Sequence, residues 1–112
     1  HGWEAWKTLP HERQRLIDLI DQSSSDTVLF ISGDRHRAGL YQLSSDSGKN
    51  IFEMTSSSLN LSFTNDEEAG PLRIGPTFVD ENYGEILLNK LTNKIIVNLK
   101  DNQGKVVQSL SL

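Results

Sequence analysis

The sequence of 112 residues contains no cysteine, which excludes both a disulfide framework and a zinc site built on thiolates. It also lacks any apolar run that approaches the roughly 18 residues needed by a transmembrane helix. Basic residues are not in excess, because 15 acidic side chains outnumber 11 basic ones and the formal net charge is −4. This charge balance, without any basic cluster, disfavours nucleic acid and anionic membrane surfaces as partners.

The composition that remains is typical of a globular domain, with 36% hydrophobic and 23% charged residues. A chain of this length forms at most one domain and buries somewhat more than ~60% of its unfolded surface. We therefore expect residues 1–112 to form a single domain with a modest hydrophobic core.

One short stretch, residues 28–37, joins an apolar segment to a connection rich in charged residues. Val28-Leu29-Phe30-Ile31 holds β-branched and aromatic side chains without interruption, which predicts a strand buried on both faces. Gly33 follows closely, and its backbone freedom suits a sharp turn at the end of a strand. Asp34 and His36 lie two residues apart in this Gly-Asp-x-His turn.

A helix is predicted before this strand, because apolar side chains recur there at helical spacing. The residues that form this apolar face are Leu9, Leu16, Ile17 and Ile20, and Leu19 widens it. Pro10 suits the first helical turn, where its missing N–H is not required, and Glu12 complements the positive end of the helix dipole. We expect the apolar face of the helix to pack on a β-sheet.

Further strands are predicted after the Gly-Asp-x-His turn and again at the end of the chain. Ala38–Leu43 and Ile51–Thr55 are expected to pair across a turn rich in serine, whereas Gly75-Pro76 indicates a loop. Three more apolar segments, separated by turn sequences, are expected to form an antiparallel meander: Glu85–Leu91, Lys94–Leu99 and Lys105–Leu110.

Asp34 and His36 are the candidate metal ligands of this sequence. A carboxylate and an imidazole at the end of a strand can converge on one ion. Asp-x-His alone has an alternative interpretation, a solvated turn in which Asp34 bonds nearby backbone amides. Arg35 and Arg37 flank His36, and they are either solvated charges or contacts for a phosphate oxygen. No catalytic residue is assigned from the sequence.

Several motifs, which follow one another along almost the whole chain, resemble a single protein family. These motifs are Trp3-Glu4-Ala5-Trp6, the Leu9–Ile20 helix, the apolar strand with Ser32-Gly33-Asp34-Arg35-His36, the Glu53–Leu59 run and Asn82-Tyr83-Gly84-Glu85-Ile86. With them the chain is similar to the C-terminal segment of the alkaline phosphatase D-like family, a branch of the calcineurin-like metallophosphatases. The resemblance implies an α+β chain that is part of an α/β metallophosphatase sandwich, with a buried strand ending in the Gly-Asp-x-His turn.

The resemblance also implies a metal-dependent phosphatase or phosphodiesterase that hydrolyses phosphate esters with a metal-activated water. Asp34 would give an oxygen ligand and His36 a nitrogen ligand to a site with two metal ions. Their identity stays open among iron, calcium, zinc and manganese. Arg35 and Arg37 are the candidate phosphate-binding residues.

The family's other metal motifs precede this segment, so we expect residues 1–112 to be the C-terminal fragment of a larger metallophosphatase domain and to be inactive alone. Apolar surface that would face the missing N-terminal part would then favour a homo-oligomer. The alternative, from a different functional class, is a small non-enzymatic β-rich interaction domain. In that case the Gly-Asp-x-His segment is only a tight turn.

Overall fold

The computed structural model describes residues 5–63 and 70–112; residues 1–4, Trp3 among them, and residues 64–69 lie outside the described part. The elements in chain order are η1 (Trp6–Thr8), α1 (Pro10–Gln22), β1 (Thr27–Ser32), β2 (Ala38–Ser44), β3 (Asn50–Ser56), β4 (Arg73–Phe78), β5 (Asn82–Asn89), β6 (Lys94–Asp101) and β7 (Val106–Ser111). No helix in the described part is long and apolar enough to span a lipid bilayer.

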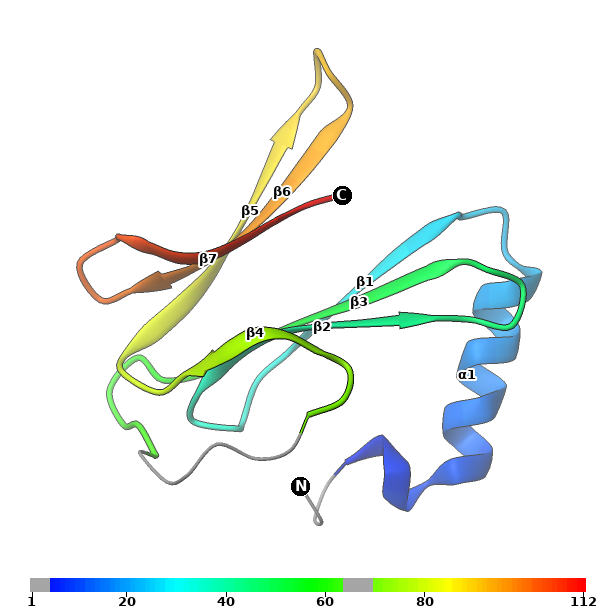
Figure 1. The fold of residues 1–112 in the computed structure, drawn as a ribbon, viewed down its shortest axis with the longest axis horizontal. Helices are drawn as coiled ribbons and strands as arrows, with labels where there is room; N and C mark the ends of the chain where they lie inside the picture. Colours follow the sequence, from blue (N-terminus) through cyan, green and yellow to red (C-terminus); the bar gives the residue numbers. More distant parts are fainter. Residues whose placement is uncertain (1–4, 64–69) are drawn as a thin grey trace.

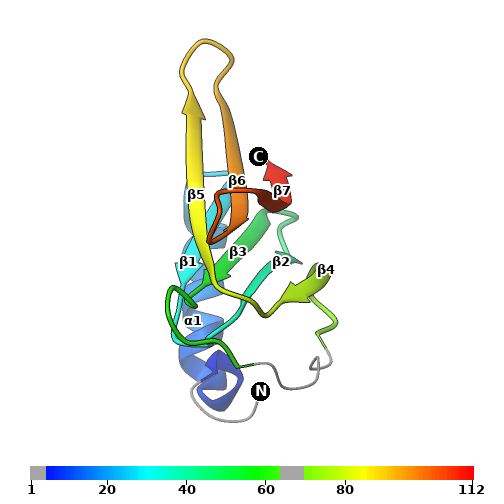
Figure 2. The same cartoon turned by 90° about the vertical axis from the view of Figure 1, so that its left-hand side faces the viewer.

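The strands form two sheets (Figure 1). The first sheet has the order β1-β3-β2-β4, with β1 parallel to β3 and the other neighbours antiparallel. The second sheet is an antiparallel meander in the order β5-β6-β7. Figure 2, viewed along the sheet stack, shows the second sheet in front of the first and α1 behind it. The chain therefore has three layers, which are α1, the first sheet and the second sheet.

The main hydrophobic core fills the space between the two sheets. The antiparallel register of β2 and β3 places Leu40 opposite Met54. Both side chains are buried together with Ala38 and with Val97 and Leu99 of β6. Because side chains alternate along a strand, Val97 and Leu99 share the face of β6 that meets the first sheet. Burial of each large apolar side chain contributes roughly 1.5–3 kcal/mol, so this core joins the sheets.

The helix covers the opposite face of the first sheet. α1 begins with Pro10 at its first turn, as expected for a residue without an N–H. Ile20 is buried, and Leu16 and Ile17 are half-buried on the side that faces the sheet. Two residues predicted as part of the same apolar face differ from the prediction: Leu19 is 63% exposed, and Leu9, which precedes the helix as its N-cap residue, is 57% exposed.

The fold class predicted from the sequence is wrong. The chain is a small β-rich domain, with 47% of the described residues in strands and 16% in helices, and not part of an α/β metallophosphatase sandwich. An α/β sheet joins parallel strands through helical crossovers. Here only β1 and β3 are parallel, and a tight turn joins β2 to β3. The expected Gly-Asp-x-His turn is also absent, since residues 33–37 form an irregular connection with bends.

The strand β1 differs from the prediction of a strand buried on both faces. It pairs with β3 on one side only and forms an edge of the first sheet. Leu29 packs against the core and Phe30 lines a cavity beneath α1, but Ile31 remains 66% exposed. A continuous apolar run does not distinguish an interior strand from an edge strand with partly covered faces.

The Gly75-Pro76 dipeptide, predicted as a loop, lies inside β4. Proline is tolerated there because β4 is the other edge of the first sheet and pairs only with β2. Gly75 has a φ angle of 72°, which glycine adopts without steric cost. The pairing of β2 with β4 shifts register between Ala38 and Leu40.

A charged pair crosses the outer sheet. Lys100 Nζ lies 2.6 Å from Oε1 of Glu85, and Asn98 Nδ2 donates to Oε2 of Glu85 at 3.0 Å. The hydrogen bonds from Lys100 and Asn98 lower the pKa of Glu85, and the bond to Glu85 raises the pKa of Lys100. Both oxygens of this carboxylate are therefore satisfied within the sheet.

We expect Leu99→Ala to destabilise the domain by about 2–5 kcal/mol, because it removes buried methyl groups and leaves a cavity between the sheets. Leu99 is 0% exposed, whereas Leu91 at the β5–β6 connection is 97% exposed. The matched control Leu91→Ala should change the unfolding free energy by less than about 0.5 kcal/mol. Chemical denaturation followed by circular dichroism measures both values. Equal effects of the two substitutions would contradict a core between the sheets.

A second prediction concerns acid stability. Because the pKa of Glu85 is lower in the folded chain than in the unfolded chain, its ionised form stabilises the fold above the ordinary glutamate value of 4.5. That contribution is lost as the pH falls through the lowered folded value. The stability difference between wild type and Glu85→Gln should therefore shrink on acidification. Denaturation at a series of pH values measures it, and parallel stability curves would argue against the prediction.

Candidate functional site

The residues predicted to bind metal lie in the connection between β1 and β2. Asp34 and His36 have φ angles of 67° and 51°, in the left-handed region, which is uncommon for non-glycine residues but several-fold enriched in Asp and His. Each such residue costs of order 1–3 kcal/mol and persists only where surrounding contacts impose it. At His36, the contacts that hold this conformation come from outside the Gly33–Arg37 loop.

Contacts from the segment after β3 hold the backbone and the ring of His36. The His36 N–H donates to Ser57 Oγ at 2.9 Å, and the Phe63 N–H donates to the His36 carbonyl oxygen at 3.1 Å. The imidazole stacks on the Phe63 ring with a centroid distance of 4.3 Å and an interplanar angle of 9°. The position of the His36 ring is therefore defined from both sides.

A further contact decides which ring nitrogen of His36 can bind a metal. Nδ1 lies 2.8 Å from the carbonyl oxygen of Leu61. A carbonyl oxygen only accepts hydrogen bonds, so in the neutral ring Nδ1 carries the proton. The lone pair is then on Nε2. Metal-binding histidines commonly donate their other ring N–H to a carbonyl or a carboxylate in this way, which fixes the tautomer.

Asp34 is exposed on the same loop. Its carboxylate forms no hydrogen bond or ion pair with the described residues. The alternative interpretation, a solvated turn, predicts hydrogen bonds from nearby backbone amides to Asp34. No such bond is found in the described part of the chain. The lone pairs of both carboxylate oxygens remain available to a ligand.

The two arginines that flank His36 differ in burial. Arg35 is half-exposed, whereas Arg37 is only 6% exposed. The Nε atom of Arg37 is buried and has no hydrogen-bond partner among the described residues. Burial of an unsatisfied charged group is costly, so Arg37 is not the solvated charge that the simpler interpretation assumed.

Asp34 and His36 form an incomplete ligand set. Residues 5–63 and 70–112 contain no group of three or more histidine, aspartate or glutamate side chains placed to hold a metal ion. Catalytic zinc sites, for comparison, have about three protein ligands. His11 is exposed in the first turn of α1, and His1 lies outside the described residues.

Sequence reasoning did not identify the residues that support His36. Ser57 and Leu61 are 21 and 25 positions away from it along the chain, and Phe63 is farther still. The alternation of Leu59, Leu61 and Phe63 indicates an extended segment but does not say what the segment contacts. Only the folded chain brings these groups to the loop.

Comparisons with protein families, with curated proteins and with solved structures give no match to this chain. The resemblance to alkaline phosphatase D-like enzymes therefore stays a prediction. The geometry of the Gly33–Arg37 loop is the observation that bears on function.

We expect the neutral form of His36 to carry its proton on Nδ1, because the Leu61 carbonyl can only accept it. Long-range proton–nitrogen correlation spectra at mildly alkaline pH distinguish the two tautomers. His11, which is exposed, serves as an internal reference for an unconstrained imidazole. A proton on Nε2 of His36 in the folded chain would contradict the hydrogen bond to Leu61.

Proposed function

We propose that the chain is part of a metal-dependent phosphoric ester hydrolase in which Asp34 and His36 bind metal. The observation that carries the proposal is the contact between His36 Nδ1 and the Leu61 carbonyl oxygen at 2.8 Å, which leaves Nε2 as the ligand atom. The Asp34 carboxylate, which has no partner among residues 5–63 and 70–112, and the left-handed backbone at both residues support it. Oxygen and imidazole ligands suit zinc, iron and manganese, whereas calcium prefers oxygen alone.

Two metal ions at such a site would lower the pKa of a bound water and neutralise charge on the reacting phosphate oxygens. The residues of this chain do the positioning. Ser57 and Phe63 hold His36 so that Nε2 is presented without reorganisation. Arg35 and Arg37, which flank His36, are the candidate contacts for a phosphate oxygen.

Asp34 and His36 are too few ligands for a binuclear centre. The proposal therefore assigns the remaining ligands to polypeptide outside residues 1–112, and the chain acts as the C-terminal segment of the enzyme. On its own it is expected to bind metal weakly and to hydrolyse phosphate esters little or not at all.

The runner-up function, a small non-enzymatic β-rich interaction domain, is favoured by one observation. The β5–β6 hairpin projects from the body of the chain (Figure 1) and carries exposed apolar side chains near its end. Leu87, Leu88 and Leu91 are 46%, 66% and 97% exposed. Grouped exposed apolar residues are typical of interaction surfaces, so this function is the outcome to expect if the metal test fails.

Titration with Zn²⁺ and Mn²⁺, followed by nuclear magnetic resonance of the loop amides, tests the proposal. We expect weak saturable binding that shifts the signals of residues 33–37, and loss of that binding in both Asp34→Ala and His36→Ala. Loss of one of two ligands should weaken binding by at least about tenfold.

The controls are His1→Ala and His11→Ala, which remove histidines outside the loop and should leave the loop shifts unchanged. Identical titrations of the wild type and both loop variants would reject the metal site and favour the interaction domain. Robust hydrolysis of p-nitrophenyl phosphate by the 112-residue chain alone would contradict the assignment of the missing ligands to other polypeptide.

A further inference from the structure

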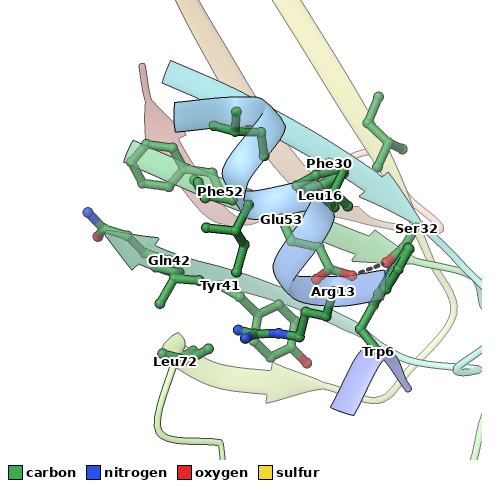
Figure 3. Close-up of a pocket in the computed structure, with 15 residues that line it drawn as sticks. Trp6, Arg13, Leu16, Phe30, Ser32, Tyr41, Gln42, Phe52, Glu53 and Leu72 are labelled. Carbon is green, nitrogen blue, oxygen red and sulfur yellow. Dashed lines mark hydrogen bonds between the residues drawn. The ribbon is translucent and has the colours of Figure 1, made fainter. Parts of the chain in front are cut away.

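A cavity of about 260 Å³ lies between α1 and the first sheet, on the face opposite the second sheet (Figure 3). Its walls are mostly apolar and come from α1 and from β1, β2 and β3, with Ile17, Ile20, Phe30 and Phe52 among them. Drug-sized pockets span roughly 300–1,000 Å³. The cavity is therefore suited to a molecule with few non-hydrogen atoms.

Two opposite charges line this mostly apolar cavity, together with the polar residues Ser32, Tyr41 and Gln42. Arg13 comes from α1 and Glu53 from β3, and both are half-buried. In Figure 3 the Glu53 carboxylate points toward Ser32 and the Arg13 guanidinium extends toward the ring of Tyr41. Both charged groups border the cavity alongside apolar side chains such as Leu16 and Phe30.

The charges are not paired with each other, although both border the same space. No ion pair joins Arg13 to Glu53, and the Arg13 guanidinium has no hydrogen-bond partner among the described residues. Glu53 Oε1 accepts from Ser32 Oγ at 2.5 Å and from Thr55 Oγ1 at 3.3 Å, which orients the carboxylate. Oε2 of Glu53 has no hydrogen bond in the described part of the chain.

We propose that this cavity binds a small zwitterion with an apolar side chain, of the class of the apolar α-amino acids. The ammonium group would meet Glu53, the carboxylate would meet Arg13, and the apolar side chain would pack against the apolar residues of the wall, such as Ile17 and Phe30. Charge-assisted hydrogen bonds of this kind are stronger than neutral ones, and partial burial protects them from solvent.

The pair of charges selects this class against simpler molecules. An alkylamine would be attracted by Glu53 but repelled by Arg13. An alkyl carboxylate would be attracted by Arg13 but repelled by Glu53. A neutral hydrocarbon would desolvate both charged groups without supplying an opposite charge to either. The site uses none of the residues of the Gly33–Arg37 loop, so it does not depend on the proposed phosphatase function.

Titration of the full chain with L-leucine, 4-methylpentanoate and 3-methylbutylamine tests the assignment. The last two probes are leucine without its ammonium and without its carboxylate. Nuclear magnetic resonance shifts of the α1 and β3 amides, with the indole signal of Trp6, report binding at the cavity. We expect leucine to bind at least about tenfold more tightly than either analogue.

Charge-neutral variants of similar shape test separately how the ammonium and the carboxylate of the ligand contribute to binding. Arg13→Gln and Glu53→Gln should each weaken leucine binding at least about tenfold. Glu53→Gln should also improve binding of 4-methylpentanoate, and Arg13→Gln should improve binding of 3-methylbutylamine, because each variant removes one repulsion. Thermal unfolding checks that both variants are folded, and a glutamine at position 53 still accepts from Ser32.

The matched control is Arg15→Gln on the same helix. Arg15 pairs with Glu12 at 2.7 Å and does not line the cavity, so leucine binding should be unchanged. The proposal would be overturned by absence of saturable leucine binding up to the solubility limit. Equal affinities for leucine and both analogues, or equal effects of Arg13→Gln and Arg15→Gln, would overturn it as well.

Discussion

The buried contact between the two sheets is the constraint on which the rest of the structure depends. Leu40 and Met54 of the first sheet meet Val97 and Leu99 of the second. The approach is close: a Cβ atom at position 84 would lie 2.7 Å from the Cε of Met54, so the flexible end of the Met54 side chain would have to shift. This contact fixes β3 against the second sheet, and β3 in turn carries β1 on one side and β2 on the other.

The position of β3 determines which residues contact the Gly33–Arg37 loop, where the candidate metal ligands lie. β1 and β3 are parallel, and Ser32 at the end of β1 pairs with Thr55 near the end of β3. The chain segments that follow parallel strands leave the sheet at the same edge. The Gly33–Arg37 loop therefore meets residues 57–63, and Ser57, Leu61 and Phe63 can hold His36. The contacts with Ser57 and Phe63 offset the cost of the left-handed backbone at His36.

Among the described residues, charged side chains are paired on the outer sheet but not in the cavity beneath α1. On the outer sheet, Glu85 and Lys100 lie 2.6 Å apart and satisfy each other, with Asn98 on the second carboxylate oxygen. Beneath α1, Arg13 and Glu53 border one cavity without an ion pair. A surface pair of the first kind contributes modestly to stability, whereas half-buried charges held apart can interact with a bound molecule.

The sequence by itself determined local structure, because periodicity and turn residues act over a few neighbouring positions. It placed the helix within Pro10–Gln22, the pairing of β2 with β3 and the C-terminal meander close to where they occur, and it singled out Asp34 and His36 as candidates. It did not show that β4 passes through Gly75-Pro76, since the tolerance of proline depends on β4 being an edge strand.

Only the tertiary structure decided how these pieces lie relative to one another. The four apolar residues of Val28–Ile31 predict a strand but not whether a second neighbour pairs with it, and the outer edge of β1 stays open. The sequence likewise does not predict the tautomer of His36, which depends on a carbonyl 25 residues away. Nor does it predict that Arg13 and Glu53 border the same cavity. The physical reason is that pairing, burial and hydrogen bonding between distant segments depend on the packing of the whole chain, which no local pattern encodes.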